Sequence, residues 1–233
     1  MRRPHAALAI LAAGASTRSG SDKVLADLGG RPVLEWSLMA GRAAGVFAET
    51  IVVTAAERVP ALRALVRTID PAARVISGGA TRTSSAWCAV DATPDAQILA
   101  IHDAARPFAP PSLFARLVQA AERDGSAVPG LAVMDTVRRT DEAGTALEEL
   151  DRAGLWIAQT PQVFGRELLI RARGRVGDRT FPDDAAALTA AGIPVKMVAG
   201  ERRNLKLTTI EDLAYARELV ACGAVGMPAV QVG

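Results

Sequence analysis

Apolar segments of strand length alternate with segments of helical periodicity along most of this chain of 233 residues. This alternation is typical of an α/β fold, in which helices connect parallel strands. The strand-like runs are apolar at successive positions, as strands are when helices cover both faces of their sheet. We therefore predict a mostly parallel sheet with helices on both faces. Ligands of such sheets bind beyond the carboxyl ends of the strands.

The same pattern gives bounds for the elements. Strands are expected at residues 6–11, 50–54, 73–77, 97–101 and 193–200. Helices are expected at residues 31–44, 57–68, 111–124 and 209–222. A further helix is expected to begin within residues 78–85 and to end at about residue 91. Ser112 is the expected N-cap of the helix at 111–124, and Asp183 or Asp184 is expected to open a further short helix.

The alternation breaks at residues 131–154, where two extended segments flank a turn at the sequence DEAG. This polar stretch predicts a β-hairpin inserted into the α/β chain. An isolated two-stranded hairpin is only marginally stable in water. We therefore expect the hairpin to pack on another surface, and a second subunit is a natural candidate.

Composition excludes several classes of protein. No apolar run reaches the roughly 18 residues of a membrane-spanning helix, so no membrane partner is expected. The net charge of +2 gives no reason to expect binding to nucleic acid. Cys88 and Cys222 are expected to be free, buried thiols in a reducing cytoplasm. His5 and His102 are the only histidines, which argues against a zinc site.

The first loop, which follows the strand at 6–11, contains Gly14, Ser16, Arg18 and Lys23. Backbone N–H groups of a glycine-rich turn bind anions, and nearby cations add to the attraction. The loop has neither a Walker spacing nor a G-x-G-x-x-G pattern. Taken alone, a loop of this kind is more often a plain connection between a strand and a helix.

Two later loops also carry charge. In the segment HDAARPF, Asp103 is placed as a magnesium ligand for phosphate chemistry would be, although it could instead cap a turn and pair with Arg106. His102 is expected to be packed rather than to act as a base. Lys206 precedes the helix at 209–222 and, alone, could be a solvated lysine. Taken together, cations, backbone donors and one carboxylate at one sheet edge suit phosphoryl or nucleotidyl transfer.

A series of ordered motifs then points to a family. They are AAGASTRSG followed by DK, GGATRTSS, HDAARPF, DTVRR, DRAGLWIAQTPQVF, DDAAAL and NLKLTTIEDL. With these motifs the chain, from about residue 6 to residue 221, resembles the 2-C-methyl-D-erythritol 4-phosphate cytidylyltransferase family. The resemblance implies a Rossmann-like nucleotidyltransferase fold and a cytoplasmic homodimer in which a hairpin arm crosses to the partner subunit. We expect one domain at residues 1–222, with 131–154 as the arm, and a C-terminal tail at 223–233.

The resemblance also implies a CTP site. Ribose and base would be contacted by the backbone of Ala12, Ala13 and Gly14, with Ala104 beside the ribose. The cytosine edge would be read by Gly79, Ala80 and Ser85. The phosphates would be held by Arg18, Lys23 and Lys206.

The remaining implied residues concern the metal and the acceptor. Asp103 matches the family's Mg²⁺ ligand. Thr136 and Arg152, on the arm, would hold methylerythritol phosphate in the other subunit's site, supported by Arg106 and Thr160. The chain departs from the family pattern in a shortened first loop with Asp22 in place of a common proline, and in Ala80 and Pro182 in place of aspartate and threonine.

The implied reaction needs no protein base, because a phosphate monoester with a second pKa of about 6 is largely dianionic at neutral pH. One of its oxygens would attack the α-phosphorus of CTP, and pyrophosphate would leave in line. Three alternatives remain at this point. They are a ribitol 5-phosphate cytidylyltransferase, a uridylyl- or molybdopterin-type nucleotidyltransferase on the same fold, and a non-catalytic nucleotide-binding subunit.

Overall fold

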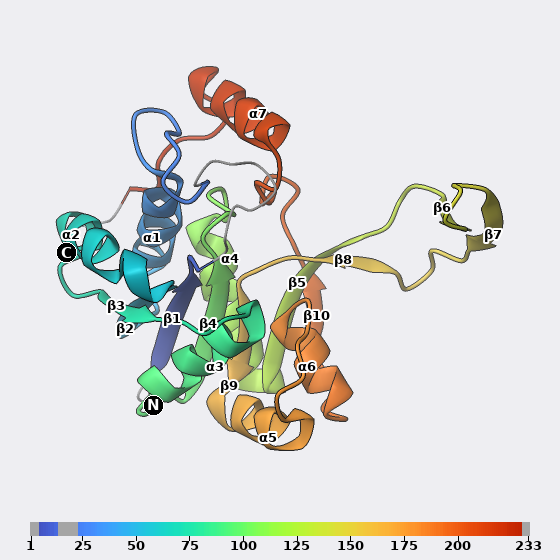
Figure 1. The fold of residues 1–233 in the computed structure, drawn as a ribbon, viewed down its shortest axis with the longest axis horizontal. Coiled ribbons are helices and arrows are strands. Elements are labelled where there is room, and N and C mark those ends of the chain that lie inside the picture. Colours follow the sequence, from blue (N-terminus) through green and yellow to red (C-terminus); the bar gives the residue numbers. More distant parts are fainter. Residues whose placement is uncertain (1–4, 14–22, 230–233) are drawn as a thin grey trace.

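The computed structural model describes residues 5–13 and 23–229, and its centre is a sheet of eight strands (Figure 1). The strand order is β10-β5-β9-β4-β1-β2-β3, with β8 paired to β5. The strands are β1 (Ala6–Leu11), β2 (Glu49–Thr54), β3 (Arg74–Ser77), β4 (Ile98–Asp103), β5 (Ser126–Ala132), β8 (Trp156–Ala158), β9 (Gln162–Gly165) and β10 (Met197–Ala199). The predicted strands are all present, although the last is shorter than expected.

Most neighbouring strands run parallel, as predicted. The pairs β1–β2, β1–β4, β2–β3 and β5–β10 are parallel. Strand β9 is antiparallel to both of its neighbours, β4 and β5. Because β9 is reversed, its first residues lie at the same sheet edge as the last residues of β4 and β5.

Helices cover both faces of the sheet. The helices are α1 (Val33–Ala43), α2 (Val59–Ile69) after a 3₁₀ turn at Ala56–Arg58, α3 (Arg82–Ala92), α4 (Pro111–Asp124), α5 (Arg166–Val176), α6 (Asp184–Ala190) and α7 (Ile210–Ala221). Leu8 and Ile10 of β1 belong to one buried apolar cluster with α1, α2 and α4. Ala7 and Ala9 belong to another with α3, α5 and α6. The apolar run at residues 6–11 thus reflects a strand buried on both faces.

Three details of the sequence interpretation are corrected. Helix α4 begins with Pro110 at the N-cap and without a side-chain cap, so Ser112 lies inside the first turn instead. Pro111 at the first helical position favours this start instead, because its φ is already helical and it lacks one of the N–H groups that have no partner inside the helix. Both cysteines are free, but Cys88 is only half-buried and Cys222 is exposed. Of the expected tail, Val225 and Met227 pack against an apolar cluster beneath α7.

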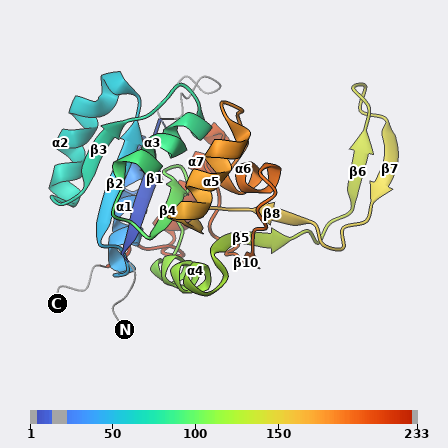
Figure 2. The ribbon, with the colours of Figure 1, turned by 90° about the horizontal axis from the view of Figure 1, so that it is seen from below.

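The inserted hairpin is confirmed. Strands β6 (Val137–Thr140) and β7 (Ala146–Leu150) form a separate two-stranded sheet that projects from the body as an arm (Figures 1 and 2). At the DEAG turn, the Thr145 N–H donates to Oδ1 of Asp141 at 2.8 Å. Ion pairs cross the arm from Arg138 to Glu149 and from Arg139 to Glu148. Strands β5 and β8 form the base of the arm.

The contact between α1 and β1 gives a test of the fold. A Cβ added at Gly41 of α1 would overlap Cδ2 of Leu8, which is fully buried. We expect Gly41→Ala to lower the free energy of unfolding by about 1–3 kcal/mol, because Leu8 has no space to move into. Gly174→Ala is the matched control: this helical glycine of α5 has nothing within 4 Å of the added Cβ. It should raise that free energy by up to about 1 kcal/mol. Urea unfolding measures both, and an unchanged Gly41→Ala variant would contradict the α1–β1 contact.

Candidate active site

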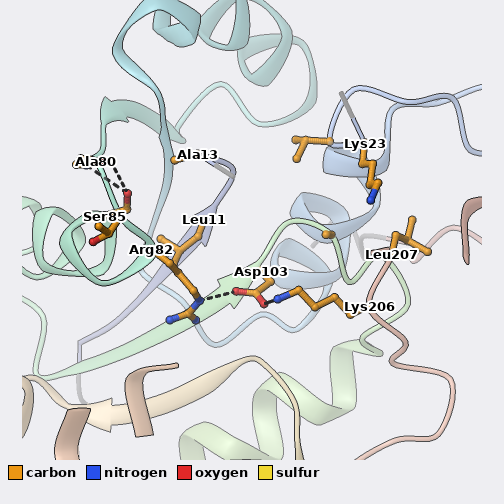
Figure 3. Close-up of a pocket in the computed structure, with 13 residues that line it drawn as sticks. Leu11, Ala13, Lys23, Ala80, Arg82, Ser85, Asp103, Lys206 and Leu207 are labelled. Atoms are coloured by element: carbon orange, nitrogen blue, oxygen red, sulfur yellow. Dashed lines mark hydrogen bonds and ion pairs between the residues drawn. The ribbon is translucent and has the colours of Figure 1, made fainter. Parts of the chain in front are cut away.

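A cavity of about 420 Å³ lies at the carboxyl edge of the sheet (Figure 3). Its walls come from the segments after β1, β3 and β4 and from the loop before α7. The lining residues are Leu11, Ala13, Lys23, Val24, Gly79, Ala80, Thr81, Arg82, Ser85, Asp103, Ala105, Lys206 and Leu207. Charged loops that are far apart in the sequence therefore meet at one edge, as the α/β pattern predicted.

Asp103 is the last residue of β4, and its carboxylate lies between two cations (Figure 3). Nε of Arg82 is 3.2 Å from Oδ1, and Nζ of Lys206 is 2.8 Å from Oδ2. Burial alone would raise the pKa of Asp103, but the charges of Arg82 and Lys206 hold it well below its usual range. The carboxylate is therefore ionised at neutral pH.

A buried hydrogen-bond chain fixes the backbone of Asp103. Its N–H donates to Oγ1 of Thr160 at 3.0 Å, and that hydroxyl lies 3.1 Å from Nδ1 of His102. Nε2 of His102 lies 3.2 Å from the carbonyl oxygen of Arg106, which can only accept. Nε2 therefore carries the proton, and Nδ1 accepts from Thr160. Burial is the main cause that lowers the pKa of His102 to about 4, so the ring is neutral and packed, as predicted.

Arg106 bonds to main-chain carbonyls rather than to the carboxylate of Asp103. Its Nη1 donates to the main-chain oxygen of Asn204 at 2.8 Å, and its Nη2 donates to the main-chain oxygen of Ala158 at 3.5 Å. Its backbone N–H donates to the main-chain carbonyl oxygen of Asp103 at 3.0 Å and closes a turn. Arg106 thus ties the loop that carries Lys206 to β8.

The wall after β3 is formed by tightly packed backbone. The Gly79 N–H donates to Oγ of the buried Ser85 at 3.2 Å. A Cβ added at Gly79 would overlap the side chain of Ser84. Thr81 caps α3 through a reciprocal capping box with Ser84. Glycine at position 79 therefore lets the backbone after β3 pack directly against the start of α3.

The predicted site residues fall into four groups, the last of which is on the arm. Those that line the cavity are Ala13, Lys23, Gly79, Ala80, Ser85, Asp103 and Lys206. Ala12, Ala104, Arg106 and Thr160 do not line it. The first two are fully buried, with their N–H groups donating to Val53 and Leu11. Ala105 lines the cavity beside Ala104. Gly14 and Arg18 lie outside the described residues.

The remaining two predicted residues lie on the arm. Thr136 precedes β6 and is exposed, and Arg152 follows β7 and donates to the Met134 oxygen. Neither lines the cavity. Their assignment to the partner's site stays a prediction.

Two charged residues of this region were not predicted as part of the site. Arg82 contacts Asp103 and also forms a bidentate pair with Asp184, at 3.1 and 2.9 Å. The sequence interpretation treated Asp183 and Asp184 alike as helix caps. Asp183 is indeed the N-cap of α6, while the buried Asp184 is the partner of Arg82. The arginine in the motif GGATRTSS was the available signal, but its partner lies 102 residues away.

Asp103 is the residue that could hold a divalent cation. Among residues 5–13 and 23–229, no group of three His, Cys, Asp or Glu side chains could hold a metal ion. Mg²⁺, however, is often held by one or two carboxylates together with substrate phosphates. A single ionised carboxylate that opens onto a cavity with two lysines fits that arrangement.

Comparison with known proteins shows which family the chain belongs to. The model of the 2-C-methyl-D-erythritol 4-phosphate cytidylyltransferase family matches residues 6–221. A bifunctional IspD/IspF enzyme of an Anaeromyxobacter species is 42% identical over 94% of this chain, which spans 58% of that enzyme's length. The 2-C-methyl-D-erythritol 4-phosphate cytidylyltransferase of Microcystis aeruginosa is 38% identical, over 92% of this chain and 98% of its own.

A solved structure gives the same result. The 4-diphosphocytidyl-2C-methyl-D-erythritol synthase of Anaerococcus prevotii superimposes with a TM-score of 0.83 at 25% identity, covering 94% of this chain and 100% of its own. The match thus extends over nearly the whole chain. This chain belongs to the 2-C-methyl-D-erythritol 4-phosphate cytidylyltransferase family.

Proposed function

We propose that this chain is a nucleotidyltransferase that joins CTP and 2-C-methyl-D-erythritol 4-phosphate and releases pyrophosphate. The observation that carries the proposal is the pairing of Lys206 with Asp103 at 2.8 Å in the cavity. A cation and an ionised carboxylate there provide, respectively, a phosphate contact and a metal ligand. The backbone wall at Gly79 and Ser85 provides close contacts for a flat base.

The residues of the site suit a reaction that needs positioning and charge rather than a protein base. His102 is neutral and its two ring nitrogens are engaged inside the protein, so it is not a candidate base. The acceptor phosphate is already largely dianionic at neutral pH. Lys206 has a side chain that is 42% exposed, so it can leave Asp103 and bind a phosphate of CTP. Lys23 lines the same cavity and adds a second cation.

We further propose that Asp103 binds Mg²⁺ together with the phosphates of CTP. When bound, the ion would neutralise charge on the phosphates as the pyrophosphate leaves. The departure of Lys206 would expose Oδ2 of Asp103, the oxygen that faces the cavity.

A cytoplasmic homodimer is also part of the proposal. Large apolar side chains are exposed on the arm and at its base, namely Met134, Leu147, Trp156 and Ile157. Exposed apolar patches of this kind favour association with another protein surface. The two free cysteines agree with a reducing compartment. In the described part of the chain, no helix combines the length and apolar character needed to cross a membrane.

The test of the proposal is pyrophosphate release with Mg²⁺, using each nucleoside triphosphate against a panel of polyol phosphates. We expect CTP with 2-C-methyl-D-erythritol 4-phosphate to be the best pair. UTP should be disfavoured strongly if buried polar groups match the cytosine edge, because a mismatch leaves them unpaired. Preference for ribitol 5-phosphate would overturn the acceptor assignment alone. CTP binding in calorimetry without turnover on any acceptor would instead indicate a non-catalytic nucleotide-binding subunit.

A further inference from the structure

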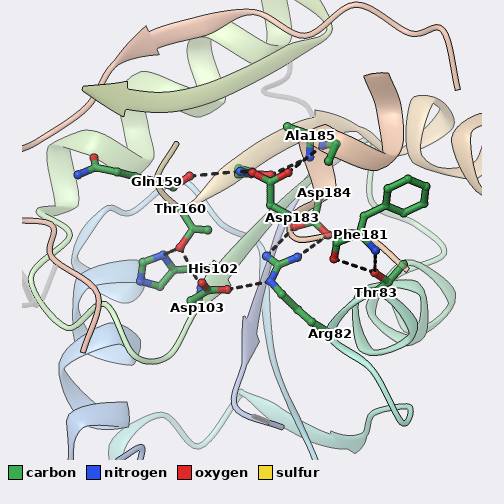
Figure 4. A network of polar contacts seen from close by, with 12 residues as sticks. Arg82, Thr83, His102, Asp103, Gln159, Thr160, Phe181, Asp183, Asp184 and Ala185 are labelled. Carbon is green, nitrogen blue, oxygen red and sulfur yellow. Dashed lines mark hydrogen bonds and ion pairs between the residues drawn. The ribbon is translucent and has the colours of Figure 1, made fainter. Parts of the chain in front are cut away.

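Four side chains of alternating charge form a row that runs from the protein interior into the cavity. Asp184 pairs with Arg82, Arg82 pairs with Asp103, and Asp103 pairs with Lys206 (Figures 3 and 4). The exposed fractions of these side chains are 3%, 23%, 12% and 42% in that order. Lys206 is therefore the member that can leave, and Asp184 is the fixed end.

The hydrogen bonds of Arg82 are divided between its two partners. Nη1 and Nη2 donate to the two oxygens of Asp184, and only Nε donates to Asp103, at its Oδ1 atom. A guanidinium group readily forms two parallel bonds to one carboxylate. The two bonds to Asp184 hold the guanidinium in one orientation, and in that orientation only Nε contacts Asp103. Oδ2 of Asp103 is thereby left to Lys206.

Asp184 is itself held firmly. It is the first residue of α6, directly after the N-cap Asp183. Nε2 of Gln162 donates to Asp183 at 2.9 Å, and the Ala185 N–H donates back to Oε1 of Gln162 at 2.9 Å. The start of α6 is thus bonded on both sides of Asp184 to Gln162, the first residue of β9. Arg82, in turn, is the first residue of α3, whose N-cap is Thr81.

We propose that Asp184 is a positioning residue for the transfer reaction: its two bonds fix the orientation of the Arg82 guanidinium, in which Arg82 contacts Oδ1 of Asp103 and not Oδ2. Without Asp184, the guanidinium can turn and bind Oδ1 and Oδ2 together. It would then compete with every group that needs Oδ2 when CTP is bound. The inference rests on the proposed cytidylyltransferase function and adds to it a residue that does not line the cavity.

The test compares Asp184→Asn with Asp183→Asn. Both replace a carboxylate with an amide at the start of α6, but Asp183 contacts Gln162 rather than Arg82. Asparagine is as good an N-cap as aspartate, so Asp183→Asn should keep the wild-type turnover number within about threefold. Asp184→Asn should lower the turnover number by about 10- to 100-fold, a loss of the size expected for a misplaced charged group. The calorimetric affinity for CTP, measured without Mg²⁺ and acceptor, should change by no more than about threefold, since the substitution alters access to Oδ2 of Asp103 and no direct contact to CTP.

A double-mutant cycle separates positioning from a merely structural role. If Asp184 acts through Arg82, then adding Asp184→Asn to Arg82→Gln should lower the turnover number by less than about twofold further. Arg82→Lys keeps the charge but lacks the fork that can hold two carboxylates. It should therefore show a loss similar to that of Asp184→Asn, and it serves as the second variant if Asp184→Asn does not fold.

The outcomes distinguish this inference from the function on which it rests. A wild-type chain that releases pyrophosphate, with Asp184→Asn or Arg82→Lys at wild-type turnover, overturns the positioning role alone. Additive losses in the cycle, or a loss seen only in KM, overturn it as well. A wild-type chain that binds CTP but transfers nothing overturns the function, and the positioning role with it.

Discussion

Replacing Lys206 by alanine is expected to lower the turnover number by about 10²–10³-fold, the range found when one preorganised donor to a developing charge is removed. In the structure Lys206 contacts Asp103, but 42% of its side chain is exposed, and it lines the cavity. Its release to a phosphate of CTP would add a cation where negative charge increases. The loss should therefore appear mainly in the turnover number rather than in the KM for CTP.

Lys196→Ala is the matched control for this prediction. Lys196 is an exposed lysine that precedes β10 and does not line the cavity. It should keep wild-type kinetics and unfold within about 0.5 kcal/mol of the wild type, as surface substitutions usually do. Lys206→Ala should lose more stability, because it removes one of the two cations that stabilise the buried carboxylate of Asp103. Near-normal turnover of a folded Lys206→Ala chain would remove this residue from the mechanism.

Mixing two inactive variants is expected to restore activity. One chain carries Arg152→Ala on the arm, and the other carries Asp103→Ala in the cavity. If the arm serves the partner's site, each mixed dimer has one site built from an intact cavity and an intact arm. Random exchange of equal amounts should then give about a quarter of the wild-type activity. Each parent alone should remain about 10²-fold or more below the wild type.

A second mixture provides the control, with both substitutions placed on one chain and the wild type as the other. If the arm acts across the interface, only wild-type dimers are active, and about a quarter of the activity remains. If the arm serves its own subunit, about half remains, and the first mixture stays inactive. Affinity tags of two kinds, one on each chain, show that mixed dimers have formed.

Most of the fold could be predicted from the sequence because its signals are local. The apolar run at residues 6–11 and the turn residues at 141–144 specify their elements through their immediate neighbours. The charged loops could be placed at one edge because parallel strands share a direction. Asp103, Lys23 and Lys206 were found in this way, and the cavity contains all three.

What the sequence did not predict depends on contacts between distant segments. The pairing of Arg82 with Asp184 depends on how α3 and α6 meet, which no local pattern encodes. Ala104 is fully buried, whereas Ala105, the next residue, lines the cavity. A small change of backbone direction therefore decides which of the two reaches the cavity. Likewise, nothing in the four residues of β9 indicates that this strand runs opposite to its neighbours.

The reversed β9 also explains how a chain of this kind can carry an arm at all. A connection between parallel strands has to return along the whole sheet, usually through a helix. Strands β5 and β9 are antiparallel, so the chain leaves β5 and enters β9 at the same edge and has no sheet to cross. The intervening residues are therefore not needed to connect one end of the sheet with the other. Substitution or lengthening there leaves the strands of the sheet paired as they are, so the length and surface of the arm can vary without disturbing the fold of the body.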